Sequence, residues 1–369
     1  MAAGVGMATI VTTGLPCGGS DRRWWRAAGS LLLGAMFLLA ACGGSANANV
    51  SGGGGKPVPL VVYSAQGYDK ATVDAFQKKT GIPTKLVDDS TGPLLSRIQA
   101  EKNNPQWGLL WVDGNFPFAS LDQQHLLARG YEPNVTWNAP GKKVVPKDQS
   151  YVPTGITLAG ALVYDSTKVS APPASWQDLT SARYRGKVGM DNPSISGPTY
   201  PLVAGRMSQL GGVSQGEKYF TDLKSNGLVI NPINGDTLHA MQTGQVSMAM
   251  IQSSAIFGAI QSDPSLKVAF PPKVTLLPSN IGIDAKAPKP EQAEARRFAA
   301  FVLSSPGQQI MQTADPTGDS LYWPVLQSVQ PLKQLPPLAS APYQTIDPGT
   351  WGGREASINQ WFTTNIVSS

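Results

Sequence analysis

From Pro57 onward, the chain alternates short apolar runs with segments of helical periodicity. Leu60–Tyr63 and Gly108–Val112 have the length and composition of buried strands, and the helical patterns that follow them include Val73 and Phe118. Strand–helix alternation at this spacing predicts parallel β-sheets covered by helices, which is an α/β fold. Ligands of such sheets bind at the carboxyl ends of the strands.

Polar side chains occupy the positions just after several of the predicted strands. In the first half of the chain they fall within 64–67, 90–91 and 113–115, and in the second half they follow Val246–Ile251. Because the carboxyl ends of parallel strands meet at one edge of a sheet, we expect a ligand-binding edge there. The candidate residues are Ser64, Gln66, Ser90, Thr91, Asp113, Asn115, Gln252 and Ser253.

A Ser/Thr-Gly-Pro tripeptide stands at the predicted start of two helices. Thr91-Gly92-Pro93 follows one strand-like run, and Ser196-Gly197-Pro198 follows another and precedes Thr199 and Tyr200. Proline suits a first helical turn, and the unpaired amides of such a turn favour anions. We predict that the two helix starts face each other across a binding cleft. The alternative is that each is an ordinary capped strand–helix unit.

The first part of the chain has the features of an export signal. Three arginines precede the apolar run Ala27–Leu39, which is too short to span a bilayer comfortably. Leu39-Ala40-Ala41-Cys42 resembles the lipobox of bacterial lipoproteins, in which the cysteine is lipidated and becomes the first residue. We therefore expect a signal peptide over 1–41, and a lipidated Cys42 with a flexible tether over 42–56. Sec and twin-arginine export both remain open.

Cysteine usage and composition narrow the function classes. Cys17 lies in the predicted signal peptide and Cys42 is the predicted anchor, so the mature domain has no cysteine for a disulfide or a metal site. The chain is 14% charged with a net charge of +5, and it has no basic stripe with interleaved aromatic residues, which argues against nucleic-acid binding. His125 and His239 are the only histidines, and no G-x-S-x-G or P-loop motif is present, so an enzyme is not expected.

Three parts of the chain resemble the extracellular solute-binding proteins of ABC importers. The first is 290–309, a helical pattern followed by Ser-Pro-Gly-Gln. The second is Trp176-Gln-Asp-Leu followed by Tyr184-Arg-Gly-Lys187, and the third is Val62-Tyr63-Ser64-Ala65 followed by Thr80-Gly81-Ile82. The resemblance covers nearly all of the mature chain, and the predicted lipobox agrees with it independently.

This resemblance implies a periplasmic-binding-protein type II fold, with two αβ lobes, crossing strands and a ligand cleft at the hinge. Lobe 1 would comprise 57–157 plus 276–330, lobe 2 would comprise 158–275, and a tail over 331–369 would end in a helix and pack onto one lobe. The lobes would close on a small polar solute and deliver it to the permease subunits of an ABC transporter. Such a protein needs no cofactor or metal. We expect a monomer that is lipid-anchored to the outer face of the cell membrane.

Within this family, the chain most resembles the branch that binds ferric iron, thiamine or 2-aminoethylphosphonate. Its iron binders have adjacent tyrosines where this chain has Gln252-Ser253-Ser254. The loops Ser90–Gly92 and Ser196–Thr199 resemble those of the phosphonate binders, so a phosphonate such as 2-aminoethylphosphonate is the expected ligand. Iron, thiamine and polyamines are the alternatives. Asp113 or Asp191 would hold the ammonium group, unless these carboxylates are helix caps or solvated loop residues.

The aromatic residues leave two interpretations open. Trp107, Trp111 and Phe116 either stack on an aromatic or cationic ligand or belong to the core. Tyr322 and Trp323 either rim the cleft or close the interface between the lobes. An alternative from another class is an exported adhesion or scaffold lipoprotein, which would not need polar strand ends in both lobes.

Overall fold

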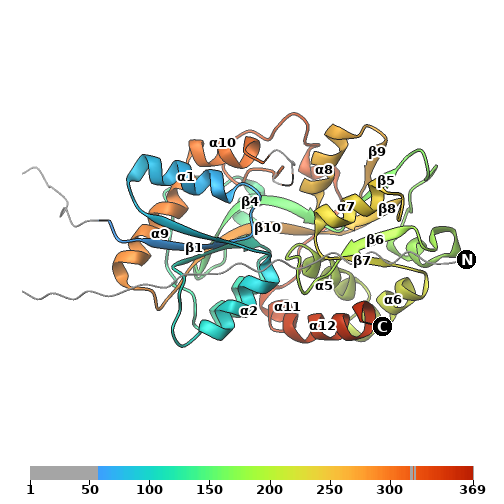
Figure 1. Cartoon of the computed structure of the whole chain (residues 1–369), viewed down its shortest axis with the longest axis horizontal. Coiled ribbons are helices and arrows are strands. Elements are labelled where there is room, and N and C mark those ends of the chain that lie inside the picture. The colour runs from blue at the N-terminus through green and yellow to red at the C-terminus, as the bar shows by residue number, and fades with distance from the viewer. Residues whose placement is uncertain (1–56, 316–318, 320, 369) are drawn as a thin grey trace, which may run out of the picture. The chain divides into compact units, whose positions relative to one another are not determined.

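The computed structural model describes residues 57–315, 319 and 321–368. The predicted signal peptide, Cys42 and the tether lie outside these residues. Two β-sheets, each covered by helices, are joined by strands that cross between them (Figure 1). We call the parts of the chain around these sheets lobe 1 and lobe 2. None of the helices in the described ranges is long and apolar enough to cross a membrane.

The lobe 1 sheet has the strand order β11-β10-β3-β1-β2, with β4 paired to β10. β1, β2 and β3 are parallel, as predicted. β10 runs antiparallel to β3 and β4 because it enters from the other lobe, so the sheet is mixed rather than purely parallel. The strands are β1 (Leu60–Ser64), β2 (Thr84–Asp88), β3 (Leu109–Asp113), β4 (Tyr151–Ala159), β10 (Val274–Ile283) and β11 (Tyr343–Gln344).

Alternating side chains of β1 decide which helices cover each face of this sheet. Leu60 and Val62 pack in one core cluster with Phe76 of α1 and Phe298 of α9. Tyr63 belongs to a second cluster on the opposite face, with residues of α2 and α3. The lobe 1 helices are α1 (Asp69–Thr80), α2 (Thr91–Glu101), α3 (Phe116–Gln123), α4 (Ala139–Val144), α9 (Lys289–Val302) and α10 (Ser305–Thr313).

The lobe 2 sheet has the order β7-β6-β8-β5-β9, with β6, β7 and β8 parallel and β5 antiparallel to its neighbours. Its strands are β5 (Ala161–Asp165), β6 (Val188–Asp191), β7 (Val229–Asn231), β8 (Met248–Ile251) and β9 (Leu266–Ala269). Its helices are α5 (Thr199–Gln209), α6 (Val213–Ser225), α7 (Asn234–Gln242) and α8 (Ser253–Ser262). Trp176 opens a short 3₁₀ helix, η1 (Trp176–Thr180), which is followed by a second one, η2 (Ala182–Tyr184).

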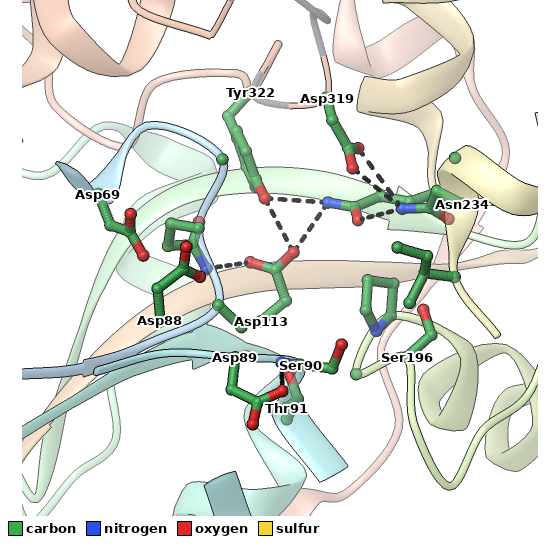
Figure 2. A pocket seen from close by; sticks show the side chains of 18 of the residues that line it. Asp69, Asp88, Asp89, Ser90, Thr91, Asp113, Ser196, Asn234, Asp319 and Tyr322 are labelled. Carbon is green, nitrogen blue, oxygen red and sulfur yellow. Dashed lines mark hydrogen bonds between the residues drawn. The ribbon is translucent and has the colours of Figure 1, made fainter. Parts of the chain in front are cut away.

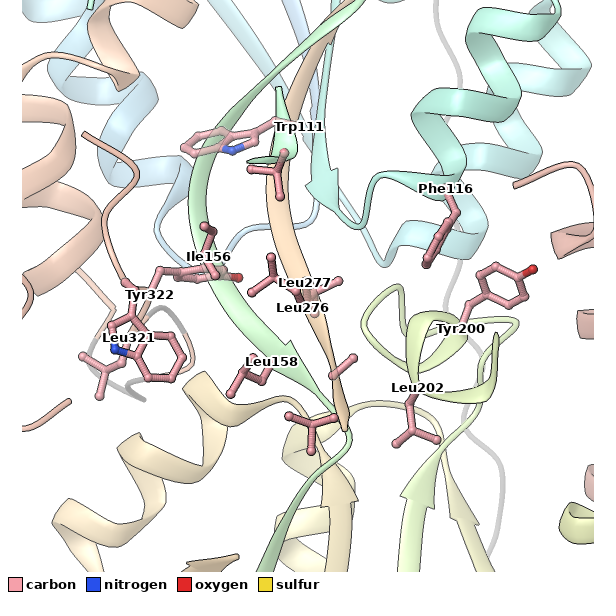
Figure 3. Close-up of a cluster of buried hydrophobic side chains, with 14 of the residues drawn as sticks. Trp111, Phe116, Ile156, Leu158, Tyr200, Leu202, Leu276, Leu277, Leu321 and Tyr322 are labelled. Carbon is pink, nitrogen blue, oxygen red and sulfur yellow. The ribbon is translucent and has the colours of Figure 1, made fainter. Parts of the chain in front are cut away.

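β4 and β10 form the hinge that links the lobes. They pair antiparallel along most of their length, with Ile156 and Leu158 of β4 beside Leu276 and Leu277 of β10 (Figure 3). Gly160, with φ of +81°, turns the chain from β4 into β5. The hinge strands are fully buried, and they position the two sheets so that the ends of their parallel strands approach each other.

The C-terminal tail contacts both lobes rather than one. Its elements are η3 (Leu338–Ser340), β11, α11 (Pro348–Gly352), α12 (Glu355–Phe362) and the π-helical turn η4 (Thr363–Val367). α11 packs on α3 of lobe 1, whereas η4 packs on α6 of lobe 2. The ring of Phe362 contacts that of Phe220 edge-on, with 5.4 Å between centroids.

Trp107, Trp111 and Phe116 of lobe 1 belong to the core. Trp111 is fully buried, packs edge-on against Tyr68 and Phe298, and donates from Nε1 to Thr154 Oγ1 at 3.2 Å. Trp107 and Phe116 are 3% and 1% exposed. The core interpretation of these residues is therefore the correct one, and stacking on a ligand is not available to them.

Candidate ligand-binding site

A cavity of about 470 Å³ lies between the lobes, where the strand ends of lobe 1 meet the helix starts of lobe 2 (Figure 2). We call it the interlobe cavity. Lobe 1 contributes the residues that follow β1, β2 and β3, and lobe 2 contributes the residues that precede or open α5, α7 and α8. The predicted candidates that line it are Gln66, Ser90, Thr91, Asp113, Ser196, Gly197, Gln252 and Tyr322.

Three other predicted candidates make hydrogen bonds within the protein and do not line the interlobe cavity. Ser64 is fully buried and accepts from the Gln66 amide at 3.3 Å, and Ser253 Oγ bonds Thr157 Oγ1 at 2.7 Å at the hinge. Tyr200 is a core residue that donates to the Trp351 carbonyl.

Asn115, Gly92 and Thr199 also lie outside the interlobe cavity. Asn115 lines a separate hollow beside 143–151, because the chain turns away at Gly114. Gly92 lines another hollow on the far side of Thr91, and Thr199 Oγ1 lies 3.5 Å from Asp191 Oδ2. The strand ends therefore lie at the interlobe cavity, but the strand-end rule did not select the side chains that face this cavity.

Asp113 is the centre of a hydrogen-bond network that joins the lobes. One carboxylate oxygen accepts from Gln66 Nε2 at 3.1 Å, and the other accepts from Tyr322 Oη and Gln252 Nε2, both at 2.8 Å (Figure 2). Gln252 belongs to lobe 2, and its Oε1 accepts from Asn234 Nδ2 at 3.3 Å. The network therefore runs from β3 of lobe 1 to the starts of α7 and α8 in lobe 2.

Three lining residues each have a buried acceptor atom with no hydrogen-bond partner in the described structure. The atoms are Gln66 Oε1, Asp69 Oδ2 and Asn234 Oδ1. The amide orientations follow from the network, since Gln66 Nε2 donates to Asp113 and Asn234 Nδ2 donates to Gln252. A buried polar atom without a partner costs about 1–3 kcal/mol. A bound molecule rich in hydrogen-bond donors would remove this cost.

The cavity is strongly acidic. A single cationic side chain, Lys70, stands among the lining residues, and its ammonium pairs with Asp74 at 2.7 Å. Burial raises the pKa of Asp319 to about 7 and that of Asp69 to about 6. The lining aspartates are Asp69, Asp88, Asp89, Asp113 and Asp319. A nearby cation would lower the pKa of these carboxyls again, so the cavity favours positive charge.

The two predicted helix starts face each other and touch, but their amides are not all available to a ligand. The Gly92 amide donates to the Ile195 carbonyl at 3.1 Å, and the Thr199 amide donates to the Ser196 carbonyl at 3.1 Å. The Ser90 amide donates to Asp89 Oδ1 at 2.7 Å. An anion site built from these particular amides is therefore not present in this arrangement of the lobes.

Asp191 lies beneath the cavity wall rather than in it. This fully buried carboxylate accepts from Thr237 Oγ1 at 2.6 Å and Ser196 Oγ at 3.2 Å. Burial raises the pKa of Asp191 to about 7. Neither sequence interpretation of Asp191 is correct: it is not an ammonium ligand of the cavity, nor a helix cap or solvated residue. It anchors the loop before α5.

Sequence reasoning missed several residues that line the cavity. Asp88, Asp89 and Asn234 follow β2 and β7, so the rule that found Ser64 would also have found them. Asp69 opens α1, where an acidic residue is ordinarily explained by the helix dipole. Asp319 lies between α10 and β11, and no local pattern brings it to the cavity. Its Oδ1 accepts from Ser254 Oγ at 3.2 Å.

Residues 71–343 match the model of a family described as bacterial extracellular solute-binding protein. The chain belongs to this family. Its members are binding proteins rather than enzymes, and they work with the permeases of ABC importers. The expected family is confirmed.

The comparisons also confirm the periplasmic-binding-protein type II fold. A Salmonella paratyphi A relative, described as a "putative 2-aminoethylphosphonate-binding periplasmic protein", is 22% identical over 262 residues, 68% of this chain and 75% of the relative. AfuA of Actinobacillus pleuropneumoniae, with fructose-6-phosphate bound, has a TM-score of 0.74 at 19% identity, over 84% of this chain and 99% of AfuA. Iron-bound HitA of Pseudomonas aeruginosa has a TM-score of 0.69 at 22% identity, over 82% and 99%. At these identities the solved structures establish the fold alone.

Proposed function

We propose that this solute-binding protein captures a small solute with a protonated amino group and delivers it to an ABC permease. The observation that carries this proposal is the acceptor-rich wall of the interlobe cavity. Gln66, Asp69 and Asn234 each present an acceptor without a partner, within a lining that has five aspartates and one lysine. An ammonium group is a compact cation with three donors and no acceptor, so it matches such a wall.

Asp113 and Asp319 are the proposed carboxylates for the amino group. Asp113 is held in place by Gln66, Gln252 and Tyr322, so its position does not depend on the ligand. Its hydrogen bonds come from neutral groups, none of the ion pairs among the described residues includes it, and burial raises the pKa of Asp113. A protonated amine would supply the missing positive charge, which stabilises the ionised form.

2-Aminoethylphosphonate is the second, more specific candidate. The similarity to the Salmonella relative favours it, and so do the hydroxyls of Ser90, Thr91 and Ser196, which line the same cavity. Its amino group would occupy the acidic end, and its phosphonate would face these hydroxyls. A solute with only anionic groups is disfavoured by the acidic lining.

Polyamines carry protonated amino groups and remain within the proposed class. Thiamine is also positively charged, but its charge is on a quaternary nitrogen without a proton to donate, so it fits this wall less well. Ferric iron fits less well. The described residues contain no group of three or more His, Cys, Asp or Glu side chains that could hold a metal ion. The strand that precedes Gln252 is also not followed by a pair of tyrosines.

We further propose that the protein acts as a monomer, exported and held on the outer face of the cell membrane through lipid on Cys42. The support is the Leu-Ala-Ala-Cys sequence that precedes a glycine-rich segment. A Cys42→Ser variant should move from the detergent phase to the aqueous phase on Triton X-114 partitioning. Detergent-phase recovery of this variant equal to wild type would contradict the anchor.

Thermal unfolding with matched ligands tests the solute class. The panel is putrescine, 2-aminoethylphosphonate, ethylphosphonate and phosphate, added to the full chain. A ligand at a hundred times its dissociation constant stabilises by about 2.7 kcal/mol, which raises the melting temperature on the order of a few degrees. We expect shifts with the amines alone. Equal shifts with ethylphosphonate and 2-aminoethylphosphonate would show that the amino group is not recognised.

A further inference from the structure

The two Ser/Thr-Gly-Pro segments meet where the lobes touch. The Gly92 amide of α2 donates to the Ile195 carbonyl of lobe 2 at 3.1 Å, and Thr91 lies against Gly197. Amides in a first helical turn have no partner within their own helix, so this one is available to the opposite lobe. We call Thr91, Gly92, Ser194, Ile195 and Gly197 the interlobe contact.

Positions 92 and 197 require glycine because there is no space for a side chain, rather than because of their backbone conformation. Neither Gly92 nor Gly197 has a positive φ, so alanine could adopt either backbone. A Cβ on Gly92 would lie 1.9 Å from the carbonyl oxygen of Ser194. A Cβ on Gly197 would lie 2.4 Å from Thr91 Oγ1. The lobes therefore approach this closely because both positions lack a side chain.

The lobe 2 side of this contact is held firmly in place by the C-terminal tail. Ser194 Oγ bonds Thr363 Oγ1 at 2.8 Å and reaches the Asn359 carbonyl at 3.2 Å. The Ser194 amide donates to Asn192 Oδ1 at 2.9 Å. Because the Ser194 carbonyl belongs to a loop fixed from both sides, it cannot easily move away from a side chain at position 92.

The interlobe contact also forms a wall of the cavity. Thr91 and Gly197 line the interlobe cavity on one side, and on the other side they line a hollow of about 560 Å³ between α2, α3 and the tail. Separating the lobes here would join the two spaces and open the cavity. The contact thus separates the interlobe cavity from this hollow.

We propose that the interlobe contact is the closure device that retains the solute, and that Gly92 and Gly197 are positioning residues for closure rather than ligands. This inference rests on the proposed function, in which closure accompanies capture. It also gives the repeated tripeptide a role different from anion binding. The glycine of each copy permits close approach of the lobes, and in the first copy the Gly92 amide also bonds the other lobe.

Distances between spin labels on the two lobes test this inference. The full chain is used with Cys17→Ser and Cys42→Ser, so that the labels attach at Lys78→Cys of α1 and Ser262→Cys of α8. Double electron–electron resonance gives the closed fraction without ligand, with putrescine and with 2-aminoethylphosphonate. Gly92→Ala and Gly197→Ala are compared with Gly353→Ala, whose φ is −64° and whose added Cβ would meet no atom closer than 3.6 Å.

We expect Gly92→Ala to lower the ratio of closed to open protein about tenfold or more, because the obstructing atom is backbone. Gly197→Ala should also lower this ratio, because its added Cβ would lie 2.8 Å from Thr91 Cβ, which rotation of the hydroxyl does not move. The effect should be smaller than that of Gly92→Ala, because the obstructing atoms belong to a side chain rather than to the backbone. Gly353→Ala should close like wild type. Alanine suits a helix better than glycine, so the melting temperature of unliganded Gly92→Ala should not fall. If that melting temperature does fall, the closed fraction of Gly197→Ala is compared with that of Gly353→Ala instead.

Two results would overturn the inference. In the first, Gly92→Ala and Gly197→Ala both close as fully as wild type. In the second, wild type shows no closed population under any condition. The proposed solute class fails separately. Wild type would then show a closed population that neither putrescine nor 2-aminoethylphosphonate increases, while Gly92→Ala abolishes it. This result would support the role of the interlobe contact in closure and contradict recognition of these amines.

Discussion

Gln252 of lobe 2 donates a 2.8 Å hydrogen bond to Asp113 of lobe 1, and both side chains are at most 5% exposed. This bond crosses the interlobe cavity, so it exists while the lobes are closed. A hydrogen bond to a charged group contributes about 1.5–3 kcal/mol. It therefore connects the position of the lobes with the electrostatics of the binding site.

Removal of this bond should weaken ligand capture. For Gln252→Ala we expect an affinity for the bound amine that is roughly ten- to a hundredfold lower by calorimetry, because the closed state loses a bond that the open state lacks. Gln99→Ala, at an exposed position of α2, is the control. An unchanged affinity in Gln252→Ala would mean that the Gln252–Asp113 bond does not contribute to closure.

Ligand affinity should fall on acidification. Burial raises the pKa of Asp319 to about 7 and that of Asp69 to about 6, so both carboxyls gain protons as the pH falls from 8 to 5. Protonation removes the negative charge that an ammonium group needs, so affinity is greatest above pH 7. It should decline by roughly tenfold per pH unit for each carboxylate that must ionise.

Putrescine is the suitable probe for this titration, because its charge is constant over the range. Melting curves without ligand at each pH control for unfolding. A ligand recognised through negative charge would show the opposite trend, with affinity rising as the aspartates are neutralised.

The free energy of unfolding of Asp191→Asn, relative to that of wild type, should increase as the pH rises. Burial raises the pKa of Asp191 to about 7 in the folded state, against about 3.9 in an unfolded chain. The folded protein therefore binds this proton more tightly, and the free energy of unfolding of wild type falls as the pH rises between these values. Asparagine does not titrate.

Urea unfolding at pH 5 and pH 8 measures this difference, with the exposed substitution Asp74→Asn as the control. A difference between Asp191→Asn and wild type that is the same at both pH values would contradict the raised pKa.

Ser253→Ala should destabilise the hinge. Ser253 Oγ accepts from the Leu158 amide at 3.1 Å and bonds Thr157 Oγ1 at 2.7 Å, all in buried surroundings. Alanine would leave that amide without a partner, at a cost of about 1–3 kcal/mol in the free energy of unfolding. Ser357→Ala, at an exposed serine of α12, should change stability by far less. If urea unfolding showed the same loss of stability in Ser253→Ala and Ser357→Ala, the buried hydrogen bonds of Ser253 would not contribute the predicted stability.

The sequence predicted the alternation of strands and helices well because periodicity is local. Leu60–Ser64 and Leu109–Asp113 are strands whose apolar residues are consecutive, since both faces of the sheet are covered. Several of the polar residues that follow such strands line the interlobe cavity. The same rule could not tell that Ser64 turns into the core whereas Gln66 lines the cavity.

The acidic character of the interlobe cavity could not be predicted from residues that are close together in the sequence. Asp319 lies more than two hundred residues from Asp113 in sequence, yet both carboxylates line the same cavity. Likewise, the anion site expected at Thr91–Pro93 depended on unpaired amides, and the opposite lobe supplies a partner to one of them.

By itself, the sequence determined the α/β class, the family, the edge of the sheet that faces the interlobe cavity and the pairing of two similar helix starts. These depend on residues close together in the chain, whose spacing sets the secondary structure and the polarity of strand ends. The tertiary structure decided which carboxylates share one cavity, which acceptors lack donors and why Gly92 and Gly197 must be glycine. Those properties depend on distances between lobes, and such distances are fixed by the packing of the hinge strands rather than by any local pattern.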